Sequence, residues 1–274
     1  MKIGCCLPGD FRRPGDTGEY TPVRSLQEGY DYMLQAGFDY IEYHVGGIAA
    51  LTQEEFDRAE QLHRRGLLTI ESFNCLLPGG IRLIGAQANR DEAIAYLERT
   101  MPRLAALGGE IAVFGSGGAR RIPEGVPEAE AQAQLEEFLI RAEAVARPLG
   151  MTLVVEPLNR KESNSILSVA RGAAIVRKLD LPALKLLADV YHMYQEKEPA
   201  GILGDQGDIL RHVHAAEPET RGAPVDCPYL NQVSRELHRI GYTGRVTIEG
   251  WLPDPVKDSV EAQPVMRRLF GPEV

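Results

Sequence analysis

Short apolar runs alternate with longer segments of helical periodicity along the whole of this 274-residue chain. The short runs suit strands that are buried on both faces, and the segments between them carry apolar residues at the spacing of one helical face. No linker or low-complexity stretch interrupts the alternation. We therefore predict an α/β fold made of a single (β/α)8 barrel over residues 1–274, with its active site at the C-terminal ends of the strands.

The predicted elements follow one another in regular order. Gly37 marks the end of the first helix as a C-cap, and Thr52 with Glu55 forms a capping box at the start of the second. Strands are predicted at residues 2–6, 40–43, 68–73, 111–114, 153–155 and 184–188, at Val213, and at 246–248. Helices are predicted at residues 25–36, 52–66, 91–107, 127–149, 168–179, 229–240 and 256–269.

Composition and charge restrict the class of protein. With 44% hydrophobic and 25% charged residues, the chain resembles an ordinary soluble globular protein. Its net charge of −9 opposes a nucleic-acid surface, because binding to phosphate backbones needs clustered cations. The four cysteines match no zinc pattern, and we find neither a signal peptide nor an apolar run of membrane-spanning length. We expect a cytoplasmic enzyme with a small-molecule partner; a homo-oligomer is compatible with the sequence, which indicates no interface.

Four residues that can bind a metal each stand at the C-terminal end of a predicted strand. They are Glu156, Asp189, His214 and Glu249. Because the parallel strands of a barrel open onto one face, these side chains can meet at one divalent ion. Three carboxylates and one imidazole form an oxygen-rich set that suits Mn2+, Co2+ or Mg2+, with Zn2+ also compatible. Acidic residues after strands also serve as helix N-caps, and this alternative stays open for each residue taken alone.

A glycine-rich segment with two arginines follows the predicted strand at 111–114. Its backbone N–H groups, together with Ser116, Arg120 and Arg121, form a candidate site for an anion such as phosphate. The alternative is a plain turn with two solvated arginines. Glu42, in the predicted strand at 40–43, is either a substrate contact or a strand-end cap.

Several short motifs in the second half of the chain resemble those of one protein family. They are Glu-Pro-Leu-Asn-Arg-Lys-Glu at residues 156–162, Asp-Val-Tyr-His at 189–192, His-Val-His at 212–214 and Ile-Glu at 248–249. Together they resemble the xylose isomerase-like barrels, in particular the ketose 3-epimerases and the sugar phosphate isomerases and epimerases.

The resemblance implies a role for each matching residue. Glu156, Asp189, His214 and Glu249 match the four metal ligands of the family. Glu156 and Glu249 also match the pair of carboxylates that exchange protons with the substrate.

Further matches imply contacts with the substrate. Glu162 and His192 match positions that contact sugar oxygens. Arg221 resembles a family arginine, although its loop is one residue longer and residues 222–224 replace the usual Pro-Gly. His212 receives no site role and is expected to pack against the helices.

The implied activity is a divalent-metal-dependent epimerase or isomerase acting on a sugar or a sugar phosphate. Removing a proton next to a carbonyl builds charge on an enediolate, which a divalent ion stabilises. One carboxylate takes the proton and a second returns one, either to the other face of the same carbon or to the neighbouring carbon. The alternative is a metal-dependent lyase or dehydratase acting on a keto-sugar or inosose. A DNA-repair endonuclease on the same barrel, or a non-catalytic barrel subunit, fits the acidic charge and the intact ligand set less well.

Overall fold

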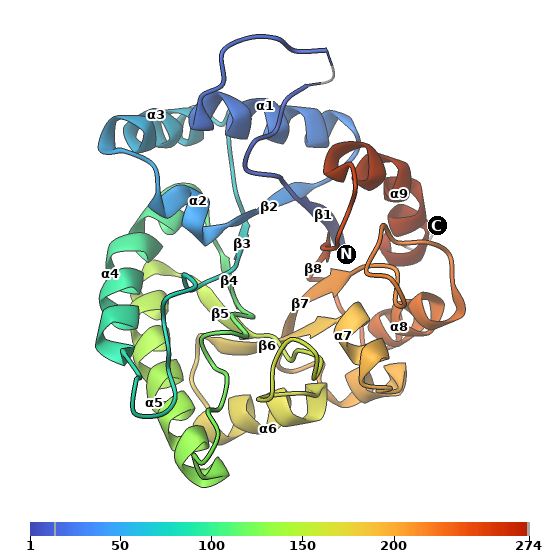
Figure 1. Cartoon of the computed structure of the whole chain (residues 1–274). Coiled ribbons are helices and arrows are strands. Elements are labelled where there is room, and N and C mark those ends of the chain that lie inside the picture. Colours follow the sequence, from blue (N-terminus) through green and yellow to red (C-terminus); the bar gives the residue numbers. More distant parts are fainter. Residues whose placement is uncertain (14, 273–274) are drawn as a thin grey trace.

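Eight parallel strands close into a barrel in the order in which they occur along the chain (Figure 1). The strands are β1 (Lys2–Cys6), β2 (Tyr40–His44), β3 (Ser72–Asn74), β4 (Ile111–Phe114), β5 (Thr152–Val155), β6 (Leu184–Asp189), β7 (Leu210–Ala215) and β8 (Arg245–Ile248). The computed structural model describes residues 1–13 and 15–272. Pairing of β8 with β1 closes the barrel, with Ile3 opposite Val246. The predicted (β/α)8 barrel is confirmed.

A ring of helices surrounds the strands (Figure 1). The short helices α2 and α7, which directly follow β2 and β6, and the 3-10 turns η1 and η2 were not predicted as separate elements. Within the described residues, no helix is both long and apolar enough to cross a membrane. The helical segments are α1 (Pro22–Gln35), α2 (Val45–Ala49), α3 (Gln53–Arg64), α4 (Arg90–Ala106), α5 (Glu128–Ala146), η1 (Arg147–Leu149), α6 (Val169–Leu179), α7 (Val190–Gln195), η2 (Ala200–Asp205), α8 (Pro228–Arg239) and α9 (Pro255–Phe270).

Local sequence explains where several helices begin. The side chain of Thr21 accepts a hydrogen bond from a backbone N–H in the first turn of α1. Thr52 and Glu55 form the predicted capping box at α3, in which each side chain accepts from the backbone N–H of the other residue. Each long helix then buries one apolar face. The buried apolar residues of α8 are Leu230, Val233 and Leu237.

The third strand begins later than predicted. The apolar run at residues 68–73 suggested a strand, whereas β3 covers only Ser72–Asn74. Leu68 and Ile70 are fully buried, but the N–H of Ile70 donates to the carbonyl oxygen of Leu107, beyond α4. The apolar run therefore signals burial at this place and not a strand over its whole length.

Strand periodicity carries the site residues to the inside of the barrel. A small apolar cluster from β4, β5 and β6, separate from the larger core, contains Val154 and Leu187. Glu156 and Asp189 stand two residues further along the same chain segments. Because alternate residues of a strand share a face, both acidic side chains continue this inward-facing row.

Candidate active site

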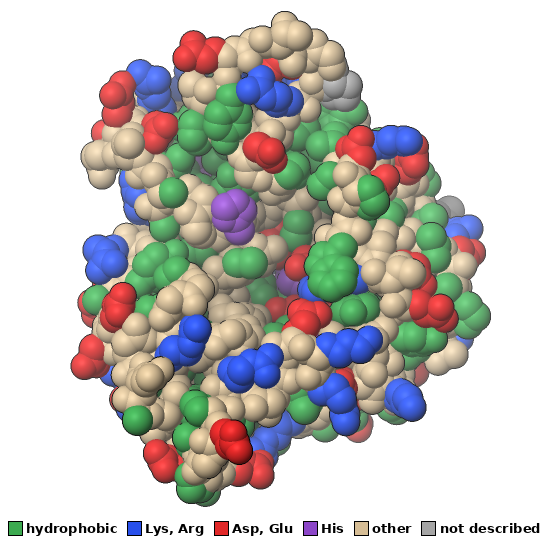
Figure 2. All heavy atoms as spheres, viewed as in Figure 1, with side chains coloured by type: hydrophobic (Ala, Val, Ile, Leu, Met, Phe, Trp, Pro, Cys, Tyr) green, Lys and Arg blue, Asp and Glu red, His purple; other side chains and the backbone are tan. Residues whose placement is uncertain are grey.

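The four predicted ligands lie together at the C-terminal ends of the strands. Asp189 is the last residue of β6 and His214 lies in β7, while Glu156 and Glu249 directly follow β5 and β8. His214 Nδ1 lies 3.2 Å from Glu156 Oε1 and 3.8 Å from Asp189 Oδ2. One ligand atom each of Asp189, His214 and Glu249 lie within 4.8 Å of one another. Figure 2 shows acidic and histidine side chains around a hollow near the middle of this face.

Asp189 has one oxygen with a partner and one without. Its Oδ1 accepts a hydrogen bond from the backbone N–H of His192, which makes Asp189 the N-cap of α7. Its Oδ2 is buried and has no hydrogen-bond partner among the described residues. An unpartnered buried carboxylate oxygen is costly, and a cation held between Asp189 and its neighbours would remove that cost. The donor set therefore fits a divalent ion that prefers oxygen ligands.

Burial alone would raise the pKa of both Glu156 and Glu249, but the groups around them shift the two pKa values in opposite directions. Burial raises the pKa of Glu249, and the positive charges of Arg221 and His214 offset only part of this effect. At Glu156 the hydrogen bond from His214 and nearby positive charges outweigh burial and lower the pKa. In the protein alone, Glu156 is therefore the better base and Glu249 the better holder of a proton.

The three residues expected to bind an anion each make one side-chain hydrogen bond within the protein. Ser116 Oγ accepts a backbone N–H from the loop after β3. Arg121 Nη2 donates to the carbonyl oxygen of Glu162. Arg120 is fully buried, and its Nη2 donates to the carbonyl oxygen of Glu156. An incoming anion cannot reach the guanidinium of Arg120 in this arrangement. Arg121 is exposed, so for Ser116 and Arg121 the anion site stays a prediction.

The glycine-rich segment instead shapes the turn that presents Glu156. A Cβ on Gly115 would overlap Oε2 of Glu156, so glycine is needed where the carboxylate passes. The guanidinium of Arg120 lies 5.4 Å from the ring centre of Phe114 and holds the carbonyl oxygen of Glu156. Burial lowers the pKa of Arg120 to about 10. Neither function of this segment was part of the sequence prediction.

Arg221 joins two acidic side chains of the site. Its Nη1 lies 3.2 Å from both carboxylate oxygens of Glu162, and its Nη2 lies 2.8 Å from Glu249 Oε2. Arg221 adopts a left-handed backbone conformation, with φ of +61°. The backbone of Gly250 passes so close that a Cβ there would overlap the carbonyl oxygen of Arg221. The strained loop therefore directs Arg221 toward the predicted ligands.

His192 presents an unpaired nitrogen beside the same cluster. Its Nδ1 lies 3.2 Å from the backbone N and 2.8 Å from the side-chain Nδ2 of Asn159. Because a backbone N–H can only donate, Nδ1 is an acceptor and the neutral ring carries its proton on Nε2. This Nε2 is buried and has no partner among the described residues, and His192 lies close to Glu156 and Asp189. The N–H is thus free to donate to a substrate oxygen.

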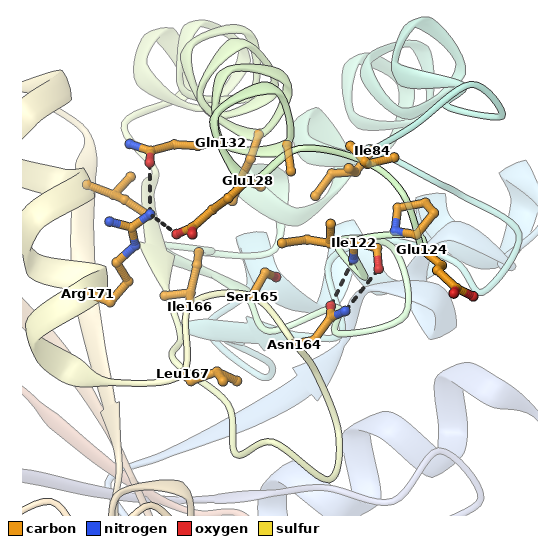
Figure 3. A pocket seen from close by; sticks show the side chains of 15 residues that line it. Ile84, Ile122, Glu124, Glu128, Gln132, Asn164, Ser165, Ile166, Leu167 and Arg171 are labelled. Atoms are coloured by element: carbon orange, nitrogen blue, oxygen red, sulfur yellow. Dashed lines mark hydrogen bonds and ion pairs between the residues drawn. The ribbon is translucent and has the colours of Figure 1, made fainter.

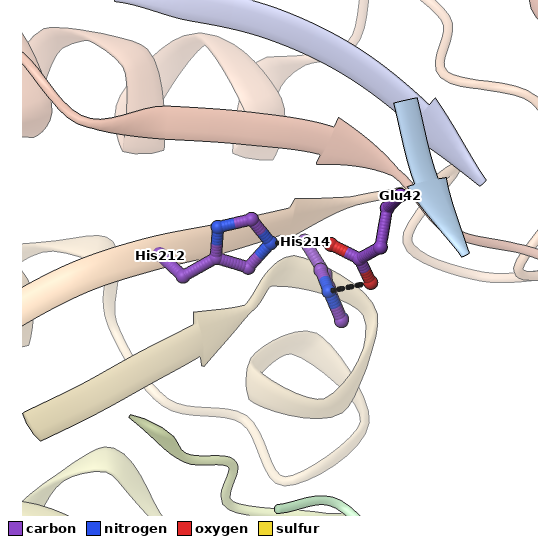
Figure 4. A group of neighbouring side chains, drawn as sticks. All are labelled: Glu42, His212 and His214. Carbon is purple, nitrogen blue, oxygen red and sulfur yellow. Dashed lines mark hydrogen bonds and ion pairs between the residues drawn. The ribbon is translucent and has the colours of Figure 1, made fainter. Parts of the chain in front are cut away.

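The pairing of Glu42 with His212 is a part of the candidate site that the sequence prediction missed (Figure 4). Glu42 is not a strand-end cap: it is fully buried within β2, 2.7 Å from His212 Nε2 and 3.0 Å from His214 Nε2. The expectation that His212 packs against the helices was wrong. Residues two apart in a strand share a face, so His212 and His214 both point toward Glu42. Strand periodicity was the one feature of the sequence that could have predicted this.

Two cavities differ in their relation to the site. One of about 220 Å3 includes Glu42 and His44 in its lining and therefore lies beside the predicted ligands. Another, of about 530 Å3, is lined largely by residues of α5, α6 and nearby loops, among them Ile122, Ile166 and Arg171 (Figure 3). No predicted ligand lines this second cavity, which is thus separate from the candidate active site.

Curated relatives match parts of the chain. A probable ketose 3-epimerase from Synechocystis sp. is 30% identical over 192 residues, which are 66% of this chain and 64% of that protein. The 3-dehydro-D-guloside 4-epimerase of Escherichia coli is 27% identical over 60% of this chain and 65% of its own length. A D-psicose 3-epimerase from Agrobacterium fabrum is 30% identical over 38% of this chain and 36% of its own. The chain thus spans between about a third and two thirds of these relatives.

Solved structures share the fold over nearly the full length. A D-psicose 3-epimerase from Clostridium cellulolyticum has a TM-score of 0.83 at 17% identity, with 98% of this chain and 99% of that chain covered. A 3-keto-D-glucoside 4-epimerase from E. coli has a TM-score of 0.78 at 23% identity, with the same coverage. The model of one family, the xylose isomerase-like TIM barrel, matches residues 30–269. This chain therefore belongs to the xylose isomerase-like TIM barrel family.

Proposed function

We propose that this protein is a divalent-metal-dependent sugar epimerase or isomerase that exchanges a proton on a carbon next to a carbonyl group. The observation that carries the proposal is the unpartnered buried oxygen of Asp189, surrounded by Glu156, His214 and Glu249. Relatives named as ketose, psicose and dehydro-guloside epimerases support a sugar as the substrate.

Glu156, Asp189, His214 and Glu249 would hold the cation. When bound, it supplies positive charge that polarises the substrate carbonyl and offsets the negative charge developing on its oxygen. The oxygen-rich ligand set favours Mn2+, Co2+ or Mg2+.

Glu156 and Glu249 exchange the proton in this proposal. Glu156, whose pKa is lowered in the protein alone, takes the proton from the substrate carbon in this proposal. Glu249, whose pKa is raised, delivers a proton in return. Return to the opposite face of the same carbon gives an epimer, and return to the neighbouring carbon gives an aldose–ketose pair.

His192 and Arg221 orient the sugar. The free Nε2–H of His192 donates to one substrate oxygen. Arg221, held between Glu162 and Glu249, offers a fixed cation beside the reacting carbon, and Glu162 accepts from a sugar hydroxyl.

Solvent deuterium exchange tests the proposal. The purified protein is incubated in D2O with a panel of free ketoses, keto-glycosides and sugar phosphates, with Mn2+, Co2+ or Mg2+ or with EDTA. We expect deuterium, measured by mass spectrometry, in the recovered sugar or its isomer, only when metal is present. An unsaturated product formed by loss of water would replace the proposal by the lyase alternative. Absence of both turnover and bound metal would contradict it.

A further inference from the structure

We propose that Glu42 is a positioning residue for metal binding, which holds Nε2 of His214 so that Nδ1 faces the other ligands. The inference rests on the proposed metal site and extends it. Glu42 contacts Nε2 of His214 (Figure 4), whereas Nδ1 of the same ring lies near Glu156.

Glu42 is a fully buried carboxylate whose two oxygens contact four other strands. Its Oε1 lies 3.0 Å from His214 Nε2 in β7 and 3.8 Å from Cys6 Sγ in β1. Its Oε2 lies 2.7 Å from His212 Nε2, 2.7 Å from Ser72 Oγ in β3 and 3.2 Å from Thr247 Oγ1 in β8. Such a set of donors makes an ionised carboxylate tolerable in the barrel interior.

The contacts around Glu42 all suit an ionised carboxylate that accepts hydrogen bonds. Thr247 donates to Glu42, and Tyr40 OH lies 2.6 Å from Thr247 Oγ1, so Tyr40 completes the chain by donating to Thr247. The Nδ1 of His212 has no partner among the described residues, which suits a neutral ring with its proton on Nε2. An ionised Glu42, which these contacts favour, has no proton to offer and acts only as an acceptor.

This arrangement determines how His214 meets a cation. Because Glu42 only accepts, Nε2 of His214 keeps its proton, and Nδ1 is the nitrogen directed toward Glu156 and Asp189. A metal-bound imidazole whose other N–H donates to a carboxylate is fixed in orientation and becomes a better ligand. Glu42 thus strengthens the metal site without being a ligand.

Glu42, His212 and His214 are close enough to form a metal site by themselves, but their hydrogen bonds oppose it. A cation among them would have to displace the Nε2 protons of both histidines and compete with the hydroxyl groups that donate to Glu42. A positioning role for Glu42, by contrast, leaves all of these hydrogen bonds in place.

The first test compares Glu42→Gln with Glu71→Gln. Glutamine places an NH2 group against at least one donor, so the dissociation constant for Mn2+, measured by competition with a fluorescent chelator, should rise about 10–100-fold. Glu71 is the matched control, because it accepts from Lys2 and Arg245 at the opposite end of the barrel. Its glutamine variant should bind Mn2+ within about twofold of the wild type, and circular dichroism checks the fold of both variants.

The second test takes its readout from the unmodified protein, and a variant serves only to assign the signal. Histidine 15N chemical shifts of the Mg2+-loaded protein should show His214 with a proton on Nε2, and a His214→Gln variant assigns the signal. A bare Nε2 on His214, or an Mn2+ affinity of Glu42→Gln within twofold of the wild type, would overturn the inference and leave the proposed function standing. Failure of the wild type to bind Mn2+, Co2+ and Mg2+ would overturn both.

Discussion

At the residue scale, Glu156 and Glu249 have different tasks although they belong to the same cluster. Replacing either one by glutamine keeps its shape but removes a ligand charge and a proton-transferring group. We expect Glu156→Gln and Glu249→Gln each to slow deuterium exchange by at least about 10²–10⁴-fold, the usual contribution of one acid–base group. The melting temperature without metal should stay near the wild-type value, and exposed Glu124→Gln is the control with normal exchange. Near wild-type exchange in either site variant would exclude the proposed pair.

The sequence predicted that the four proposed ligands lie together, because each follows an apolar run and the barrel brings the ends of such runs together. It did not predict the pairing of Glu42 with His212, whose positions lie 170 residues apart along the chain. Nor did it predict the buried position of Arg120: an arginine after a glycine-rich turn looks solvated until the neighbouring strand and Phe114 are in place. The positions of such side chains depend on partners from distant segments of the chain.

At the element scale, the order of strands and helices was predictable because apolar runs and caps are local signals. The limits of β3 were not, since a buried loop and a strand share the same apolar run. The short helix α7 was also missed. Its N-cap is Asp189. At this residue the two alternatives considered for acidic strand ends, N-cap and metal ligand, are both compatible with the geometry.

The double use of Asp189 leads to a prediction for α7. Asp189→Asn keeps an oxygen that caps the helix but loses the ligand charge, so the apo protein should melt no lower than the wild type. The rise in melting temperature on adding Mn2+ should disappear, because binding to the folded state is lost. Asp189→Ala also loses the cap and should be about 0.5–2 kcal/mol less stable than the asparagine variant. Equal stability of the two variants, or an unchanged response to Mn2+ in Asp189→Asn, would contradict this double role.

At the scale of the whole molecule, the barrel must join strands from the two ends of the chain, and charges on its N-terminal face assist this closure. Glu71, just before β3, accepts from Lys2 at 2.8 Å and from Arg245 at 2.8 Å, so it connects the starts of β1 and β8. Arg245 also pairs with Glu110 at 2.7 Å. The side chain of Arg245 is only 12% exposed, so water compensates poorly for a lost partner.

Glu71→Gln should therefore destabilise the fold without touching the metal site. We expect a loss of about 1–3 kcal/mol in the free energy of unfolding, which corresponds to a fall of several degrees in melting temperature for a chain of this size. Glu60→Gln is the control, because it breaks an exposed pair with Arg64 within α3 and should change the stability by less than about 0.5 kcal/mol. Differential scanning calorimetry measures both variants. Equal melting temperatures for Glu71→Gln and Glu60→Gln would mean that strand pairing and core packing close the barrel without help from these charges.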